Sequence, residues 1–151
     1  MEAGLLHLHS FLRRIALLAI LISLIKSFGG MRNGKAFTAS DNRWSLITLI
    51  VFHTQLVIGF ALYFLNGWYR YIGVMDDDRT RFFSLEHAFG MVVAVVLITM
   101  GRSKAKKSEL SLVKHKRTFW YFLFALIIVL ATIPWPFREV VGAGRSWFPG
   151  M

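Results

Sequence analysis

Histidine is the residue type in this sequence that is best suited to chemistry. The chain of 151 residues has five histidines and no cysteine. A neutral imidazole is a common metal ligand, and it can also carry a proton near neutral pH. The lack of cysteine excludes disulfides, thiolate metal sites, iron–sulfur clusters and thiol catalysis. Any metal or proton chemistry therefore depends on where the imidazoles lie, at His7, His9, His53, His87 and His115.

Four of the histidines fall at or within four long apolar stretches, one in each. The chain is 56% hydrophobic and 17% charged, whereas a soluble domain has about 25% charged residues. A helix needs roughly 20 mostly apolar residues to cross a membrane, and a backbone in lipid must satisfy its own hydrogen bonds. We therefore expect no ordinary soluble enzyme. The sequence predicts a single all-α domain over 1–151, an integral membrane four-helix bundle that runs up-down-up-down with spans at about 5–28, 44–65, 82–101 and 112–133.

The basic residues predict how the bundle is oriented. The first and third connections, with the adjoining span ends, carry eleven Lys and Arg against two acidic residues, and the opposite face carries seven against six. These give +9 and +1, which together make the chain's net charge of +10. Positive loops stay in the cytoplasm. We therefore expect a multi-pass protein of the bacterial inner membrane with both termini on the periplasmic side.

The expected depths of the histidines pair them across the bundle. At about 1.5 Å per residue, His9 and His87 both lie roughly 6–8 Å below the outer boundary. Spans one and three are diagonal in such a bundle, as are spans two and four. A flat macrocycle between diagonal helices can receive one imidazole from each side, which is bis-His ligation of haem b. The sequence thus predicts an outer haem on His9 and His87. An inner haem on His53 and His115 is also expected, although their depths match less well.

Neighbouring residues suit this interpretation and leave alternatives open. Arg13 lies one turn after His9 and needs an anion, which could be a haem propionate, Glu86 or a lipid phosphate. On the face of His87, Gly90 and Ala94 are expected to leave room. Other roles remain for three of the histidines: a helix-end position for His7, a hydrogen bond to Gln55 or Thr48 for His53, and a solvated loop position for His115.

Several sequence segments resemble a known family. They are HLHSFLRR, FHTQLVIGFALYF, RFFSLEHAFGMV, GRSKAKK followed by KHKR, and IPWPFR. Together they cover essentially the whole chain, and they are similar to small bacterial inner-membrane proteins identified as cytochrome B. The resemblance implies a four-helix b-type cytochrome with His9, His53, His87 and His115 as haem ligands. One difference is Arg14, where the family commonly has Trp.

The function expected from these observations is electron transfer within or near a quinone-linked respiratory chain, with one or two bis-His haems. The protein would be an electron carrier or an oxidoreductase subunit rather than a complete enzyme. Its expected partners are the lipid bilayer, haem, quinone and other respiratory membrane subunits. Nucleic acid is not expected, because the basic run has no interleaved aromatic residues to stack bases.

Two other classes of function remain open at this point. One is a haem-free accessory subunit of a larger membrane complex. The other is a small transporter or proton relay that uses His53, Glu86 and His87. The acidic run 76–78 is interpreted as a solvated loop, because Arg79 and Arg81 flank it.

Overall fold

The structure, a computed structural model, describes residues 2–73 and 77–142. Asp76 and Arg145 lie outside these residues. Both were included in the charge of the predicted periplasmic face. Four long helices make up most of the described chain: α1 (Glu2–Asn33), α2 (Ala39–Leu65), α4 (His87–Lys106) and α5 (Ser111–Thr132). The short elements are η1 (Trp68–Tyr71), α3 (Asp78–Arg81), the π-helical turn η2 (Phe82–Glu86) and α6 (Glu139–Gly142). The predicted all-α four-helix bundle is confirmed.

Three of the described helical stretches are long and apolar enough to cross a membrane. They are Ala3–Asn33, Ala39–Leu65 and Asp78–Lys106, the last of which runs through α3, η2 and α4. The fourth predicted span, 112–133, forms α5 but is not one of the three. Its first turns contain the basic residues Lys114, Lys116 and Arg117.

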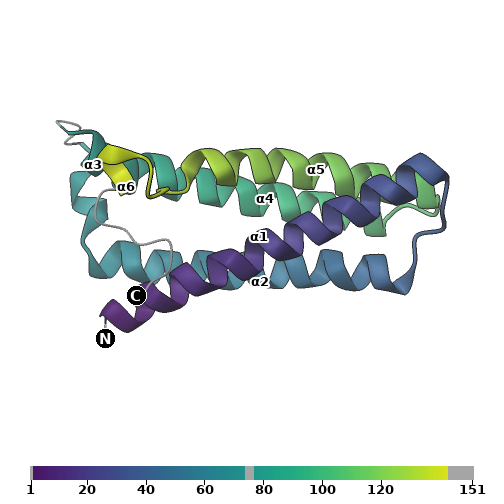
Figure 1. Ribbon diagram of the computed structural model, residues 1–151, viewed down its shortest axis with the longest axis horizontal. Coiled ribbons are helices and arrows are strands. Elements are labelled where there is room, and N and C mark those ends of the chain that lie inside the picture. The colour runs from purple at the N-terminus through teal and green to yellow at the C-terminus, as the bar shows by residue number, and fades with distance from the viewer. Residues whose placement is uncertain (1, 74–76, 143–151) are drawn as a thin grey trace.

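The four long helices surround one interior. Neighbouring helices pack in the order α1, α2, α4, α5 and back to α1, which leaves α1 diagonal to α4 and α2 diagonal to α5. Figure 1 shows α1 crossing obliquely, near α2 at its own N-terminal end and near α5 at the opposite end. The α1–α2 and α4–α5 connections share one end, and the short elements gather at the other. The predicted diagonal relation of the helices is thus confirmed.

Small side chains bring the helices close together, as is usual where helices associate in lipid. On α4, Gly90 and Gly101 both face α5. A Cβ at Gly90 would lie 2.6 Å from the Cγ2 atom of Thr132, and one at Gly101 would lie 2.5 Å from the Cβ atom of Tyr121. Ala94 is fully buried in the core. The expectation that Gly90 and Ala94 leave room beside His87 is therefore wrong for this packing, because both positions serve helix contact.

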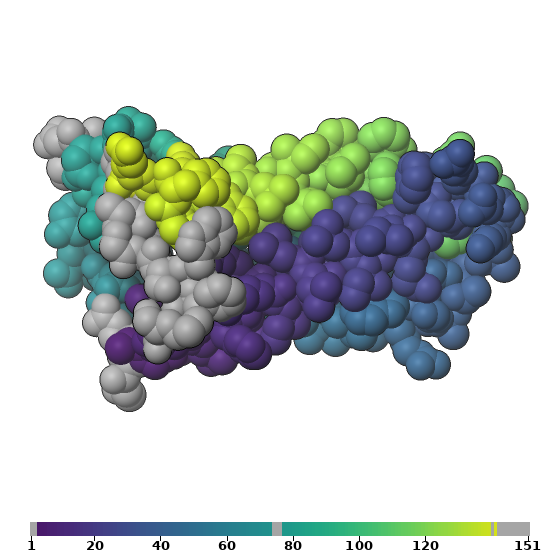
Figure 2. Space-filling view, in the orientation of Figure 1, coloured from purple at the N-terminus to yellow at the C-terminus, as the bar shows by residue number. Residues whose placement is uncertain are grey.

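Polar and apolar side chains are distributed as a lipid environment requires. The interior contains hydrogen-bonded hydroxyls, such as Ser23 and Thr48, whose oxygens lie 2.9 Å apart. Large apolar side chains face outward on the long helices, including Ile25 at 71% exposure and Val57 at 68%. Figure 2 shows how the long helices expose continuous side-chain surface between the two ends of the bundle. An apolar exterior of this size indicates contact with lipid.

The last turn of α1 offers a test of this close packing. A Cβ at Gly30 would fall 2.2–2.6 Å from three ring atoms of His115, which is 1% exposed. The neighbouring Gly29 has no atom within 4 Å of its hypothetical Cβ. We expect Gly30→Ala to lower the unfolding free energy by about 1–3 kcal/mol through overpacking. Gly29→Ala is the matched control, neutral or stabilising by up to about 1 kcal/mol because alanine is the better helix former.

The measurement is thermal unfolding of both variants in detergent, followed by tryptophan fluorescence. Equal stability of Gly29→Ala and Gly30→Ala would contradict the tight contact between α1 and α5 at this level.

Candidate functional site

Two of the four predicted ligands meet across the bundle diagonal. His9 lies in the first turns of α1, and His87 is the first residue of α4. Their ring centroids are 6.5 Å apart, with 74° between the ring planes. A metal ion bound by one nitrogen of each ring at about 2.0–2.1 Å, on opposite sides, would hold the centroids roughly 6 Å apart. The spacing of His9 and His87 would thus admit one metal ion between the two imidazoles, and it is also that of an edge-to-face ring contact.

One ring nitrogen of His87 has a defined role. Its Nδ1 lies 2.7 Å from the carbonyl oxygen of Thr132 on α5. A carbonyl only accepts hydrogen bonds, so Nδ1 carries a proton, and in the neutral ring Nε2 is the nitrogen with the lone pair. Carbonyl partners of this kind orient metal-binding imidazoles and raise their basicity. The tautomer of His87 is therefore the one that a ligand through Nε2 requires.

The backbone before His87 is a π-helical turn, which the sequence did not reveal. The amide of His87 donates to the carbonyl of Phe82, and the hydroxyl of Tyr63 on α2 donates to the carbonyl of Ser84 at 2.9 Å. Turns of this kind insert one extra residue into a helix and are frequent at functional sites. The rings of Phe82 and Phe83 pack 5.9 and 6.2 Å from that of His87. Aromatic packing and the Tyr63 hydrogen bond thus brace the turn that presents His87.

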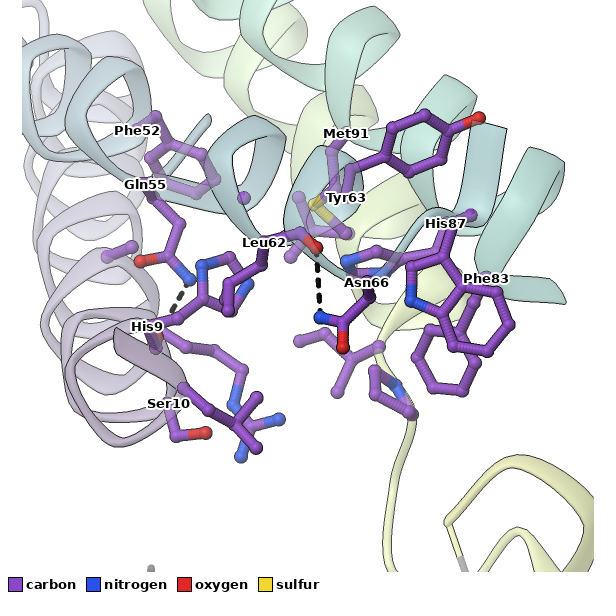
Figure 3. Close-up of a pocket in the computed structure, with 18 of the residues that line it drawn as sticks. His9, Ser10, Phe52, Gln55, Leu62, Tyr63, Asn66, Phe83, His87 and Met91 are labelled. Atoms are coloured by element: carbon purple, nitrogen blue, oxygen red, sulfur yellow. Dashed lines mark hydrogen bonds between the residues drawn. The ribbon is translucent and has the colours of Figure 1, made fainter. Parts of the chain in front are cut away.

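His9 is positioned by two residues of α2. The side-chain amide of Gln55 donates to the carbonyl oxygen of His9 at 2.9 Å, as Figure 3 shows. Gly59 faces the ring, and a Cβ there would lie 3.2 Å from the Cε1 atom of His9. Gln55 and Thr48 were considered as hydrogen-bond partners of His53. In the structure, Gln55 instead donates to the His9 carbonyl, and the hydroxyl of Thr48 is hydrogen-bonded to that of Ser23.

Open space adjoins the imidazole pair. A cavity of about 280 Å³ is lined by His9, His87 and residues of all four long helices. A second cavity of about 50 Å³ shares both histidines, together with Gln55, Gly59 and Met91. Figure 3 shows His9 and His87 projecting from different helices into this region. Ligand sites usually have ~300–1,000 Å³, so the larger cavity, at about 280 Å³, is near the lower end of that range.

Several polar side chains line the larger cavity beside the histidines, among them Arg13, Gln55 and a second cation, Arg79. Arg13 is half-buried there, and its predicted partner Glu86 instead accepts from Nε of Arg81 at 2.8 Å. The buried Oε1 atom of Gln55 has no hydrogen-bond partner among the residues that the structure describes. Arg13 at the wall of this mostly apolar cavity could pair with a propionate of a bound haem. The carbonyl oxygen of Gln55 would need a hydrogen-bond donor instead, which an ionised propionate does not offer. The histidine pair and Arg13 therefore fit a haem with propionates.

The inner pair is not brought together. Nδ1 of His53 lies 2.8 Å from the carbonyl of Leu49, and its Nε2 lies 3.5 Å from the hydroxyl of Thr99. Gly101 of α4 packs on Tyr121 of α5, and the two helices are antiparallel. Thr99, the neighbour of His53, therefore lies at a level of α5 about eight residues beyond His115. This is a separation of about 12 Å along the helix axis. The prediction of His53 and His115 as partners on one inner haem disagrees with this packing.

His115 is instead a buried residue between α1 and the α1–α2 connection. It is 1% exposed, its ring centroid lies 5.0 Å from that of Phe37, and Gly30 provides the space for it. Neither ring nitrogen has a hydrogen-bond partner within the described parts of the chain. The alternative of a solvated loop position for His115 is therefore wrong. His7, by contrast, is exposed near the start of α1.

No group of three or more His, Asp or Glu side chains converges as a metal site within residues 2–73 and 77–142. A bis-imidazole haem needs only two protein ligands on its iron, so the pair remains the candidate. No family model, curated protein or solved structure matches the chain. The site therefore has to be interpreted from its own geometry.

Proposed function

We propose that the protein is a membrane-bound b-type cytochrome that holds one haem between His9 and His87. The observation that carries this proposal is the 6.5 Å approach of the two imidazoles across the diagonal of the bundle. The Nδ1 hydrogen bond of His87 and the adjoining cavity support it. The single site replaces the expected choice of one or two haems, because His53 and His115 have other neighbours.

In this proposal the protein's own residues bind, orient and shield the cofactor. His9 and His87 would hold the haem iron, and Arg13 would pair with a propionate. Phe52, Leu62 and Val129 line the same cavity and exclude water from it. A bound haem would supply one-electron redox chemistry, and the axial ligands and burial would tune its potential. The protein would act as an electron carrier or as a subunit of an oxidoreductase.

The proposed setting is the bacterial inner membrane, near the quinone pool and other respiratory subunits. The two connections rich in Lys and Arg share one end of the bundle, and the N-terminal end of α1 lies at the other with α6. Basic loops stay in the cytoplasm, which supports a haem close to the periplasmic side. The resemblance to cytochrome B proteins in segments such as HLHSFLRR is in keeping with this proposal.

The first test is the pigment of the purified protein. We expect reduced-minus-oxidised b-type absorbance bands and one haem per chain. His9→Ala or His87→Ala should abolish the haem, because a single imidazole leaves the iron with one protein ligand. His7→Ala is the matched control on the same helix, since His7 is exposed, and His53→Ala should also keep the haem. A colourless wild-type protein would favour the haem-free accessory subunit, and two haems per chain would contradict the single site.

The second test addresses Arg13 through the redox potential. Removing a cation beside the haem disfavours the electron-rich reduced state, so Arg13→Gln should lower the midpoint potential. We expect a fall of roughly 30–60 mV, where 59 mV corresponds to a tenfold change in a one-electron equilibrium. Arg14→Gln is the matched control, because Arg14 does not line the cavity. A potentiometric titration that gives equal potentials for the two variants would remove Arg13 from the site.

A further inference from the structure

Another cavity, distinct from the two beside the histidine pair, lies at the opposite end of the bundle. It has about 300 Å³ and is bounded by the start of α2, the end of α4 and the start of α5. Three cationic residues line it, Arg102, Lys106 and Lys114, and no acidic residue does. Thr38, Asn42 and Ser45 add polar groups to its wall. This composition favours an anion.

Arg102 is the most informative of these residues because it is 8% exposed. Its Nη1 donates to the carbonyl of Asn42 at 3.0 Å and to the hydroxyl of Ser45. Both acceptors are neutral, and no carboxylate forms an ion pair with Arg102 within the described residues. Buried cations in membrane proteins are costly and are normally paired. Arg102 is therefore a buried cation whose partners among the described residues are neutral.

The nearest acidic group on α2 already has other partners. Asp41 lies 3.2 Å from Nζ of Lys26, and it accepts hydrogen bonds from the amide and the hydroxyl of Thr38. The bond from the Thr38 amide, with the reciprocal bond from the Asp41 amide to the Thr38 hydroxyl, forms the capping box that begins the 27-residue helix α2. Asp41 therefore does not neutralise Arg102, whereas the N-terminal end of the helix adds further positive potential beside the cavity.

The two lysines stand at the cavity where it meets the basic end of the bundle. Lys106 is exposed in the last turn of α4, and Lys114 lies in the first turn of α5 with its Nζ 5.9 Å from the ring centroid of Phe37. Lys106 and Lys114 can thus reach an anion that also contacts the buried Arg102. Three cations around one small space suit a phosphate group, which has several acceptor oxygens and more than one negative charge.

We infer that this cavity binds a phosphate group through Arg102, Lys106 and Lys114. The group belongs either to the headgroup of an anionic lipid or to free phosphate, since both present the same oxygens. The basic connections around the cavity also attract anionic lipid in a diffuse way. Binding at a specific site can be distinguished from this diffuse attraction. It is weakened by removing the lysines that line the cavity, but not by removing the same number of lysines elsewhere.

The test compares two double variants that lose the same charge from the same two helix ends. Lys106→Gln with Lys114→Gln removes the lysines that line the cavity, and Lys107→Gln with Lys116→Gln removes exposed neighbours that do not. Thermal unfolding of the full-length protein in detergent is followed while phosphatidylglycerol, phosphatidylcholine or inorganic phosphate is added at constant ionic strength. A ligand that binds only the folded state raises the unfolding temperature.

We expect phosphatidylglycerol or inorganic phosphate to stabilise the wild type and the Lys107/Lys116 variant alike. The Lys106/Lys114 variant should bind at least about tenfold more weakly, because charge-assisted hydrogen bonds are lost. Stabilisation by phosphatidylglycerol alone identifies a lipid headgroup, and stabilisation by inorganic phosphate as well identifies a site open to the free anion. Equal responses of the two double variants, or no response of the wild type, would overturn the proposal. None of these readouts depends on haem.

Discussion

The approach of His9 to His87 is the contact on which the interpretation of this molecule depends. It joins α1 and α4, which are diagonal and pack mainly through α2 and α5 rather than against each other. Each imidazole is held from a third helix: Gln55 of α2 bonds the backbone of His9, and the carbonyl of Thr132 on α5 orients His87. All four long helices thus position the pair, so its geometry belongs to the whole bundle.

Close packing fills the middle of the bundle, and two large cavities lie at its ends. Gly90 and Gly101 bring α4 against α5, and Gly30 lets α1 close over His115. The apolar core between the two ends is filled by residues such as Ile20, Ile98 and Phe122, each fully buried. Interiors packed in this way have few voids larger than a water molecule. Cavities of about 280 and 300 Å³ at the two ends are therefore notable features of the fold.

Sequence reasoning reached the bundle, its diagonal order and the meeting of His9 with His87, because helical rise and alternating direction fix depth within a turn. The pairing of His53 with His115 rested on depths estimated from separate helix ends, and in the structure the two rings face different neighbours. Gly90 was expected to leave space for a ligand, but it allows α4 to pack closely against Thr132 of α5. A glycine in the sequence does not show which of these two roles it has. The π-helical turn and the Arg102 cavity depend on contacts between elements, which no local pattern encodes.

The two ends of the molecule follow one electrostatic rule. Arg13 and Arg102 are each at least half-hidden from solvent, each lines a cavity, and neither forms an ion pair with a carboxylate among the described residues. A guanidinium stays charged in proteins, so it cannot lower the penalty of burial by losing its proton. In a medium of low dielectric constant an anion from outside the chain would offset this penalty. The two proposals follow from this reasoning, with a propionate beside the half-buried Arg13 and a phosphate beside the buried Arg102. Each proposed ligand would lie at its own end of the bundle.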